Sequence, residues 1–226
     1  MRVPWDRGGI RWYLIFFSLV VGKTSIPSTL WGLPFLLAGV AMHLWAKGCL
    51  HQKQEVTSSG PYRFVRHPFY LGNAFVDFSI AVMSGSWILT CALVPWWLSV
   101  YIPVMRQEEA VMTDRFGDAY RAYASRVPRL LPLARPIPAA SGFSWRNPNI
   151  LKTEVPRVLR FLSYPFLFLL AYELRQGGLV FPPDVTALAV CSLLLFILLN
   201  GAAWQVRQVA RRPADSVETN LDGESA

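Results

Sequence analysis

A histidine, a tyrosine and two neighbouring carboxylates are the residues of this chain whose types and spacing point most clearly to chemistry. His67 and Tyr70 lie in the polar, basic and aromatic stretch 58–72, and Glu108 and Glu109 follow a long apolar segment. Imidazole and carboxylate groups are common general bases in enzymes. These side chains are therefore the first candidates for a catalytic or binding site.

The stretch around His67 predicts a corner in the chain. Gly60-Pro61 is typical of a turn, and Pro68 disfavours helical geometry at the residue before it. Because proline suits the first turn of a helix, we expect a helix to begin at Pro68. The N–H groups at this helix start would lie at the same corner as Arg66 and His67, where they would favour an anionic group.

A helical hairpin is predicted to position these groups. The segment 69–105 carries Asp77 as its single charge and is too long for one membrane span. Because Ser84-Gly85-Ser86 interrupts it, we expect two helices, 69–83 and 86–105, folded back on each other. An antiparallel hairpin brings its two ends, and with them the histidine and the glutamates, to the same surface.

The two glutamates are not expected to act alike. Adjacent residues on a helix point about 100° apart, so only one of the pair can face the site squarely. The other is expected to be solvated or paired with an arginine. Taken singly, an exposed imidazole at a helix entry and a solvated helix start explain the two motifs, but their matched positions at one hairpin favour a shared site.

The composition predicts an all-α polytopic membrane protein with about six transmembrane helices. The chain is 53% hydrophobic and only 16% charged, which is typical of a membrane protein. The hairpin supplies two of the apolar segments. The others are a short first segment at 12–22, a convincing span at 30–50, and two later segments at 161–174 and 185–204.

The positions of the basic residues predict the orientation in the membrane. With six spans, 20 of the 22 lysines and arginines fall on the side of both termini, and only Lys23 and Arg175 fall on the other. This bias places both termini, the corner and the 106–158 segment in the cytoplasm. It also accounts for the net charge of +8 through membrane lipid headgroups rather than nucleic acid.

Isolated polar residues in the apolar segments are expected to find partners inside the protein. His43 is expected to bond a neighbouring helix or to face the membrane interface. Asp77 is expected to face protein or water, because a carboxylate facing lipid is costly. We predict one domain over residues 1–212, with its core motifs at 54–132, and a disordered tail at 213–226. The sequence shows no metal cluster, no nucleophile triad and no disulfide spacing among its three cysteines.

The motifs resemble those of the isoprenylcysteine carboxyl methyltransferase and phospholipid methyltransferase superfamily of membrane proteins. The similarity runs in order and spacing from about 54 to 132. It rests on Ser59-Gly60-Pro61-Tyr62, Arg66-His67-Pro68-Phe69-Tyr70-Leu71-Gly72, Glu108-Glu109, Phe116-Gly117, Tyr120, Tyr123 and Arg126-Val127-Pro128. The resemblance implies an integral membrane methyltransferase with S-adenosylmethionine as cofactor. It also implies a cytoplasm-facing pocket and a lipophilic acceptor that enters from the bilayer.

The resemblance also implies roles for individual residues. The residues expected to contact the cofactor are Gln54, Glu55, Val56, Thr57, Tyr62, His67, Pro68, Phe69, Tyr70, Gly72 and Glu108. Arg106 is the nearest candidate for the substrate-binding arginine. A sulfonium cation suits a carboxylate and aromatic faces. An amine or phenol acceptor would need a base, for which His67, Glu108 and Glu109 are the candidates.

Two other classes of function are compatible with parts of the pattern. An NADPH-dependent membrane reductase of the sterol-reductase type has a similar histidine and tyrosine corner, but the double glutamate followed by Phe116-Gly117 favours the methyltransferase. A non-enzymatic membrane scaffold with a degenerate site is the second alternative, which the intact histidine, tyrosine and glutamate disfavour. The sequence leaves the acceptor open among lipid amines, carboxylates, thiols and hydroxyls.

Overall fold

The structure of this chain is a computed structural model that describes residues 7–50, 56–133, 135–138, 150–176 and 183–211. All regular structure within these residues is helical, which confirms the predicted all-α class. The predicted tail 213–226 lies outside the described residues. The elements are α1 (Arg7–Val21), α2 (Ile26–Cys49), the 3₁₀ turn η1 (Gly60–Arg63), α3 (Pro68–Met83), α4 (Trp87–Phe116), α5 (Asp118–Arg126), the π-helical turn η2 (Ile150–Glu154), α6 (Val155–Gln176) and α7 (Pro183–Arg211).

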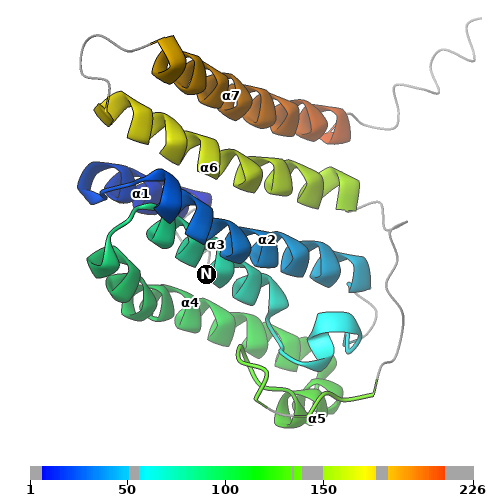
Figure 1. Cartoon of the computed structure of the whole chain (residues 1–226). Coiled ribbons are helices and arrows are strands. Elements are labelled where there is room, and N and C mark those ends of the chain that lie inside the picture. Colours follow the sequence, from blue (N-terminus) through cyan, green and yellow to red (C-terminus); the bar gives the residue numbers. More distant parts are fainter. Residues whose placement is uncertain (1–6, 51–55, 134, 139–149, 177–182, 212–226) are drawn as a thin grey trace, which may run out of the picture.

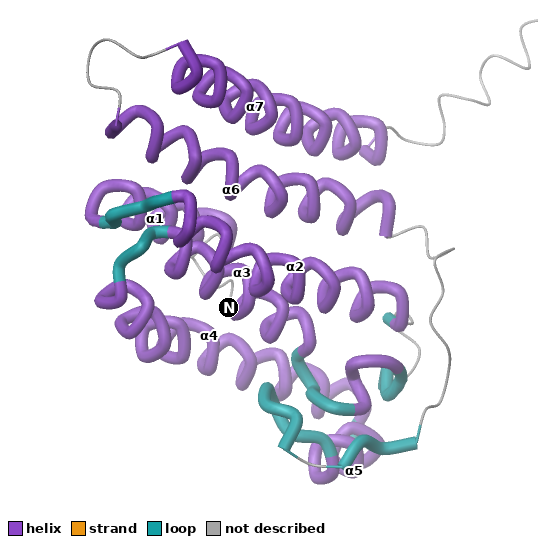
Figure 2. Tube along the Cα trace, in the orientation of Figure 1, coloured by secondary structure: helices purple, strands orange, loops and turns teal. Residues whose placement is uncertain are grey.

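The long helices lie side by side with alternating directions (Figure 1). The ends of α2 and α4 and the starts of α3 and α6 gather at one end of the bundle, together with η1 and α5. At the opposite end, short loops join α1 to α2 and α3 to α4 (Figure 2). Arg175 also lies at this opposite end of the bundle, where it donates hydrogen bonds to the carbonyls of Leu19 and Gly22.

Each of the six predicted apolar segments is helical, and three of the helices are long and apolar enough to cross a membrane. These three are α2, α4 and α6. The apolar parts of α1 and α7 and the whole of α3 are shorter, at Arg11–Val21, Val190–Val206 and Pro68–Met83. The helices therefore support a membrane protein, and the number of crossings stays a prediction.

The hairpin of α3 and α4 forms as the sequence predicts. α3 ends at Met83, and α4 begins after Ser86, whose side chain accepts a hydrogen bond from the amide of Leu89. Gly85 has a φ of 67°, a backbone conformation that residues with a side chain rarely adopt. The hairpin is tight because only Ser84, Gly85 and Ser86 separate the two helices.

α2 and α3 pack closely because small residues line their interface. A Cβ atom at Gly39 would lie 2.6 Å from Cγ2 of Val76 and 2.9 Å from the carbonyl oxygen of Gly72. Small residues let helix backbones approach in this way where side chains of ordinary size would not fit. This close approach places the second half of α2 directly beside the first turns of α3.

Asp77 faces the protein interior, as predicted. Its carboxylate is 3% exposed and accepts hydrogen bonds from Nε of Arg11 at 2.5 Å and from Nε1 of Trp97 at 3.2 Å. Arg11 on α1 and Trp97 on α4 are thereby tied to α3. A buried ion pair of this kind leaves an uncompensated charge when one partner is removed, so it fixes α1 against the hairpin.

Candidate functional site

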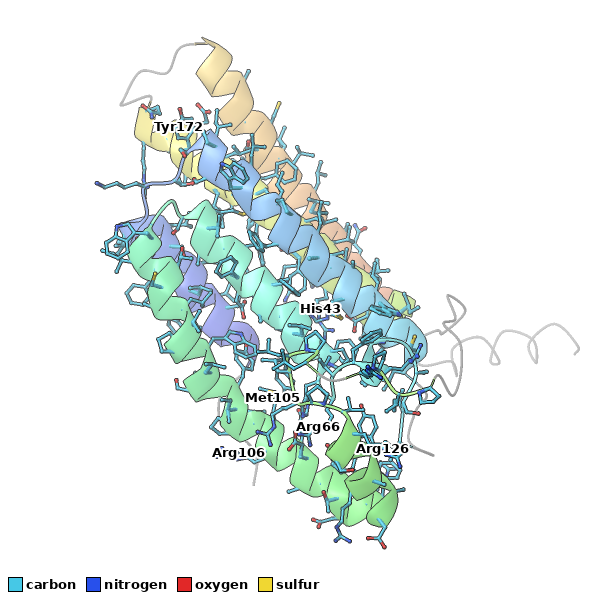
Figure 3. The ribbon with its side chains drawn as sticks, turned by 60° about the horizontal axis from the view of Figure 1, so that its bottom comes forward. His43, Arg66, Met105, Arg106, Arg126 and Tyr172 are labelled. Carbon is cyan, nitrogen blue, oxygen red and sulfur yellow. The ribbon has the colours of Figure 1, made fainter. Side chains whose placement is uncertain are left out.

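A cavity of about 890 Å³ lies at the end of the bundle where α3 begins. Its wall combines residues of α1 to α6 with the chain segment before α3. Figure 3 shows His43 and Arg66 at this end, with Arg106 on the outer side of α4 and Tyr172 at the opposite end of the bundle. Such a volume is typical of a pocket for a small molecule.

The predicted corner is held by the loop that follows α5. The amide of Arg66 donates to the carbonyl of Pro128 at 2.8 Å, and the amide of His67 donates to the carbonyl of Arg129 at 3.1 Å. α3 then begins at Pro68 with His67 as its N-cap, and no side chain caps this helix start. The first turn of α3 therefore presents the positive end of its backbone dipole beside the cavity.

His67 is fixed by a carboxylate that is itself fixed by an arginine. Its Nε2 lies 3.0 Å from Oε1 of Glu109. Arg129 donates to both oxygens of Glu109, from Nε at 2.8 Å and from a terminal nitrogen at 2.7 Å. Arg66 approaches the same carboxylate at 3.4 Å. Glu109 is 13% exposed and does not line the cavity, so it orients its neighbours.

Burial lowers the pKa of His67 below its usual value, and the nearby Glu109 and Glu108 only partly oppose this shift. The imidazole is therefore neutral at neutral pH. Because the carboxylate of Glu109 can only accept, the hydrogen bond assigns the proton to Nε2. Nδ1 is left with its lone pair, 3.8 Å from Oε2 of Glu108 on the cavity wall.

Glu108 is the glutamate that faces the cavity. Its side chain is 39% exposed, and Tyr70 donates its hydroxyl hydrogen to Oε1 at 2.7 Å. The expected difference between the two glutamates is thus present, since Glu109 pairs with Arg129 instead. On α4, Met112 and Arg115 follow Glu108 at helical spacings of four and seven and also line the cavity.

Three buried tyrosines of η1 and α5 form part of the cavity wall. Tyr62, Tyr120 and Tyr123 line it together with Val56 and Thr57. The hydroxyl of Tyr123 donates to the carbonyl of Tyr62 at 2.8 Å, which ties α5 to η1. Burial raises the pKa of both Tyr62 and Tyr123 above the usual range. Their hydroxyls therefore stay neutral, and the two side chains present aromatic rings rather than charge to the cavity.

A second end of the cavity, where α6 packs on α2, contains polar residues that the sequence did not assign to a site. His43 bonds a neighbouring helix, as predicted, with Nε2 at 3.2 Å from Oδ1 of Asn73. Its Nδ1 is buried 3.4 Å from Oε2 of Glu154 but makes no hydrogen bond among the described residues. Arg157 donates to both oxygens of Glu154 at 2.6 Å. Arg11 lines the same end and donates to Asn73 at 3.0 Å.

A helical signal for this second end is present in the sequence. Glu154, Arg157, Phe161 and Tyr164 recur every three or four residues and all line the cavity. Such spacing places them on one face of a helix. The prediction took the arginines of this region only as charges that set the orientation in the membrane, so this face was missed.

The cavity brings together most of the residues predicted to bind a cofactor, but not all. His67, Pro68, Phe69 and Tyr70 line it with Tyr62, Val56, Thr57 and Glu108. Gln54 and Glu55 lie outside the described residues. In the described part of the chain, no group of three or more histidine, cysteine, aspartate or glutamate side chains is arranged to hold a metal ion.

Two residues that were predicted to bind the cofactor or the substrate do not line the cavity. Gly72 does not line the cavity, and a Cβ atom there would lie 2.9 Å from Cδ2 of His43, so this glycine serves the packing of α2 on α3. Arg106 is exposed and also absent from the cavity wall. Residues two apart on a helix point about 200° apart, so Arg106 cannot share the face of Glu108.

Residues 30–119 match the phospholipid methyltransferase family. This range, the matched segment, runs from α2 to the start of α5 and contains both the His67 corner and the glutamate pair. The site described above lies largely within it. The resemblance to the membrane methyltransferase superfamily is therefore confirmed for this part of the chain.

Three curated relatives show similarity to parts of the chain. Methanethiol S-methyltransferase 1 of Bradyrhizobium diazoefficiens is 38% identical over 34% of this chain and 26% of its own length. The cobalt-zinc-cadmium resistance protein CzcN of Cupriavidus metallidurans is 28% identical over 52% and 58%. The protein-S-isoprenylcysteine O-methyltransferase of Schizosaccharomyces pombe is 31% identical over 34% and 33%.

The chain thus spans about a quarter to three fifths of the length of these relatives. No solved structure matches it significantly. Two of the three relatives are named as methyltransferases, and they act through different acceptor atoms according to their names, a thiol sulfur and an oxygen. The comparisons therefore show a resemblance to membrane methyltransferases over part of the chain, and the relatives' names do not agree on one acceptor.

Proposed function

We propose that this chain is an integral membrane methyltransferase that uses S-adenosylmethionine and transfers a methyl group to a lipophilic or membrane-associated acceptor. The observation that carries the proposal is the junction of the hairpin ends. There His67, Tyr70 and Glu108 line one wall of a cavity of about 890 Å³, and all three lie in the matched segment.

The residues at the corner fit the chemistry of this cofactor. S-adenosylmethionine, when bound, supplies a methyl group activated by a positively charged sulfur. The carboxylate of Glu108 and the aromatic faces of Tyr62 and Tyr120 suit that charge. The uncapped start of α3 suits the carboxylate of the cofactor. Nε of Arg66 is also buried without a hydrogen-bond partner in the described part of the chain.

His67 is the residue we assign to proton transfer. Its Nδ1 keeps a lone pair beside Glu108, because Glu109 holds the proton on Nε2. It can accept the proton of an amine, phenol or thiol acceptor as the new bond to carbon forms. Glu109 is a positioning residue, since both its oxygens bind Arg129. A carboxylate or thiolate acceptor needs no base at all.

The orientation in the membrane remains part of the proposal. The cavity lies at the end of the bundle where α2 and α4 finish and α3 and α6 start (Figure 1). Arg66, Arg115, Arg129 and Arg157 are among the basic residues of this end, and basic loops favour the cytoplasmic side. We therefore place the cavity and both termini in the cytoplasm, where the cofactor is made.

The test is methyl transfer from S-adenosylmethionine labelled in its methyl group to a membrane lipid extract, with the purified protein in detergent. The wild type should label a lipid-soluble product. At a cofactor concentration below saturation, Glu108→Gln should reduce labelling about tenfold or more, and Arg121→Gln on the exposed face of α5 should retain it. Binding of NADPH with no binding of S-adenosylmethionine would favour the reductase instead, and binding of neither by folded protein would favour a scaffold.

A further inference from the structure

The second end of the cavity is built mainly by residues outside the matched segment. On α6 and the turn before it, Arg157, Arg160, Phe161 and Tyr164 line the cavity with Glu154. They face α2, where Lys47 and His43 line the same end. The family match ends at residue 119. These residues therefore define a feature of this chain that its resemblance to the family does not assign.

Among the described residues, this end of the cavity carries an excess of positive charge. Lys47, Arg157 and Arg160 line it, whereas Glu154 is the acidic residue that lines it. Glu154 is already bound by Arg157 through both oxygens, and its carboxylate also faces His43. No carboxylate of the described residues lies within 4.0 Å of the guanidinium of Arg160.

The other charged groups that the structure describes at this end do not cancel this excess. Arg11 also lines this end, but its charge is matched by Asp77 at 2.5 Å. Both nitrogens of His43 face oxygens, those of Asn73 and Glu154. The groups that face Arg160 across the cavity thus leave a cationic surface that can accept an oxyanion.

Apolar surface lies beside these cations. Phe161 and Tyr164 line the cavity on α6, and Trp12 lines it on α1, with the rings of Trp12 and Tyr164 at 6.4 Å in an edge-on arrangement. Trp12 is 43% exposed on the outer surface of the bundle. An anionic group that carries a hydrocarbon tail would match both the cations and this apolar path.

We propose that this end of the cavity binds the oxyanion of a lipophilic acceptor, a carboxylate or a phosphate, with Arg160 as its principal cation and Lys47 and Arg157 beside it. The identification of the ligand as an acceptor rests on the proposed function. The binding of an anionic amphiphile does not, because it depends only on the charges and apolar surface of the cavity.

The test measures equilibrium binding of three ten-carbon probes to the purified protein in a non-ionic detergent: decanoate, decyl phosphate and the uncharged decanamide. We expect at least one anion to bind about tenfold more tightly than the amide. Arg160→Gln should weaken the anion about five- to tenfold and leave the amide unchanged. Arg160→Lys should restore most of the affinity, and Arg121→Gln, the matched exposed control, should behave as the wild type.

The results separate the alternatives. Preference for decanoate identifies a carboxylate acceptor, preference for decyl phosphate identifies a phospholipid, and both support the subsite. Equal binding of anion and amide, or an unchanged affinity in Arg160→Gln with a normal thermal unfolding profile, overturns it. Weaker binding of S-adenosylmethionine in Arg160→Gln, with anion binding intact, also overturns it, since the cation would then hold the cofactor. Anion binding that depends on Arg160 in a protein that does not bind S-adenosylmethionine keeps the subsite and removes the methyltransferase proposal.

Discussion

The same substitution, glutamate to glutamine, should lower stability at Glu109 and cofactor affinity at Glu108. In Glu109→Gln, the chain loses the charge that binds Arg129 at 2.7 and 2.8 Å and that orients His67. Hydrogen bonds to charged groups contribute about 1.5–3 kcal/mol each. Because Arg129 is 34% exposed, we discount the sum and expect a loss of about 2–3 kcal/mol of unfolding free energy.

Glu108→Gln should leave stability almost unchanged. The side chain is 39% exposed, and the amide oxygen of glutamine can still accept the hydroxyl of Tyr70. The expected change in unfolding free energy is below about 1 kcal/mol. Its effect should fall on the cofactor instead, with affinity for S-adenosylmethionine reduced about tenfold or more as the carboxylate loses its charge.

Thermal unfolding in detergent and titration with S-adenosylmethionine measure the two effects in the same preparations. A fall of roughly 5–10 °C in Tm is expected for Glu109→Gln and almost none for Glu108→Gln. If the two variants lost stability equally, the clamp formed by Arg129 would not be structural. If Glu109→Gln weakened the cofactor more than Glu108→Gln did, the assignment of Glu108 as the cavity carboxylate would be refuted.

Three further predictions concern pH, packing and buried charge. Because burial lowers the pKa of His67, the unfolded chain takes up this proton at a higher pH than the folded chain does. Stability should therefore fall as pH drops below about 6.5. Unfolding midpoints measured against pH should show this fall in the wild type and a smaller one in His67→Gln. Gly39→Ala should lose about 1–3 kcal/mol of stability through overpacking against α3, measured by thermal unfolding, whereas Gly201→Ala, in open space, should not. Asp77→Asn should cost about 3–5 kcal/mol by leaving Arg11 unpaired, with expression and unfolding as readouts, and an unaffected protein would contradict the buried pair.

The parts of the fold that sequence reasoning predicted are those with local signals. Pro68 marks the start of α3, and Ser84-Gly85-Ser86 marks the hairpin turn. From these two signals the juxtaposition of His67 and Glu108 follows, because a hairpin returns its ends to one surface. Helical geometry also predicts that only one glutamate faces the site, and it leaves the other either solvated or paired with an arginine.

The parts that it missed depend on contacts between distant segments. Arg129 clamps Glu109 from the loop after α5, and no local pattern indicates that partner. Arg106 was chosen by its closeness in sequence to the glutamates, but its helical phase turns it away from the cavity. Gly72 was assigned to the cofactor through its motif, and this role stays a prediction; in the fold the residue does not line the cavity, and its lack of a side chain makes room for His43.

The second end of the cavity was also missed because it depends on contacts between distant segments. α6 approaches α2 only in the folded bundle, where Glu154 reaches His43 at 3.4 Å. In the sequence, the charges of this region are equally consistent with a basic loop at a membrane surface. The helical recurrence of Arg157, Phe161 and Tyr164 indicates a shared face, but only the fold shows what that face meets.

The corner of His67 and Glu108 is proposed to bind S-adenosylmethionine. The most direct measurement is equilibrium binding of labelled S-adenosylmethionine to the detergent-purified chain, compared between the wild type, Glu108→Gln and the exposed-surface variant Arg121→Gln. We predict saturable binding in the wild type and in Arg121→Gln, and affinity at least about tenfold lower in Glu108→Gln. Saturable binding of equal affinity in all three folded proteins, or no binding in any of them, would contradict the account.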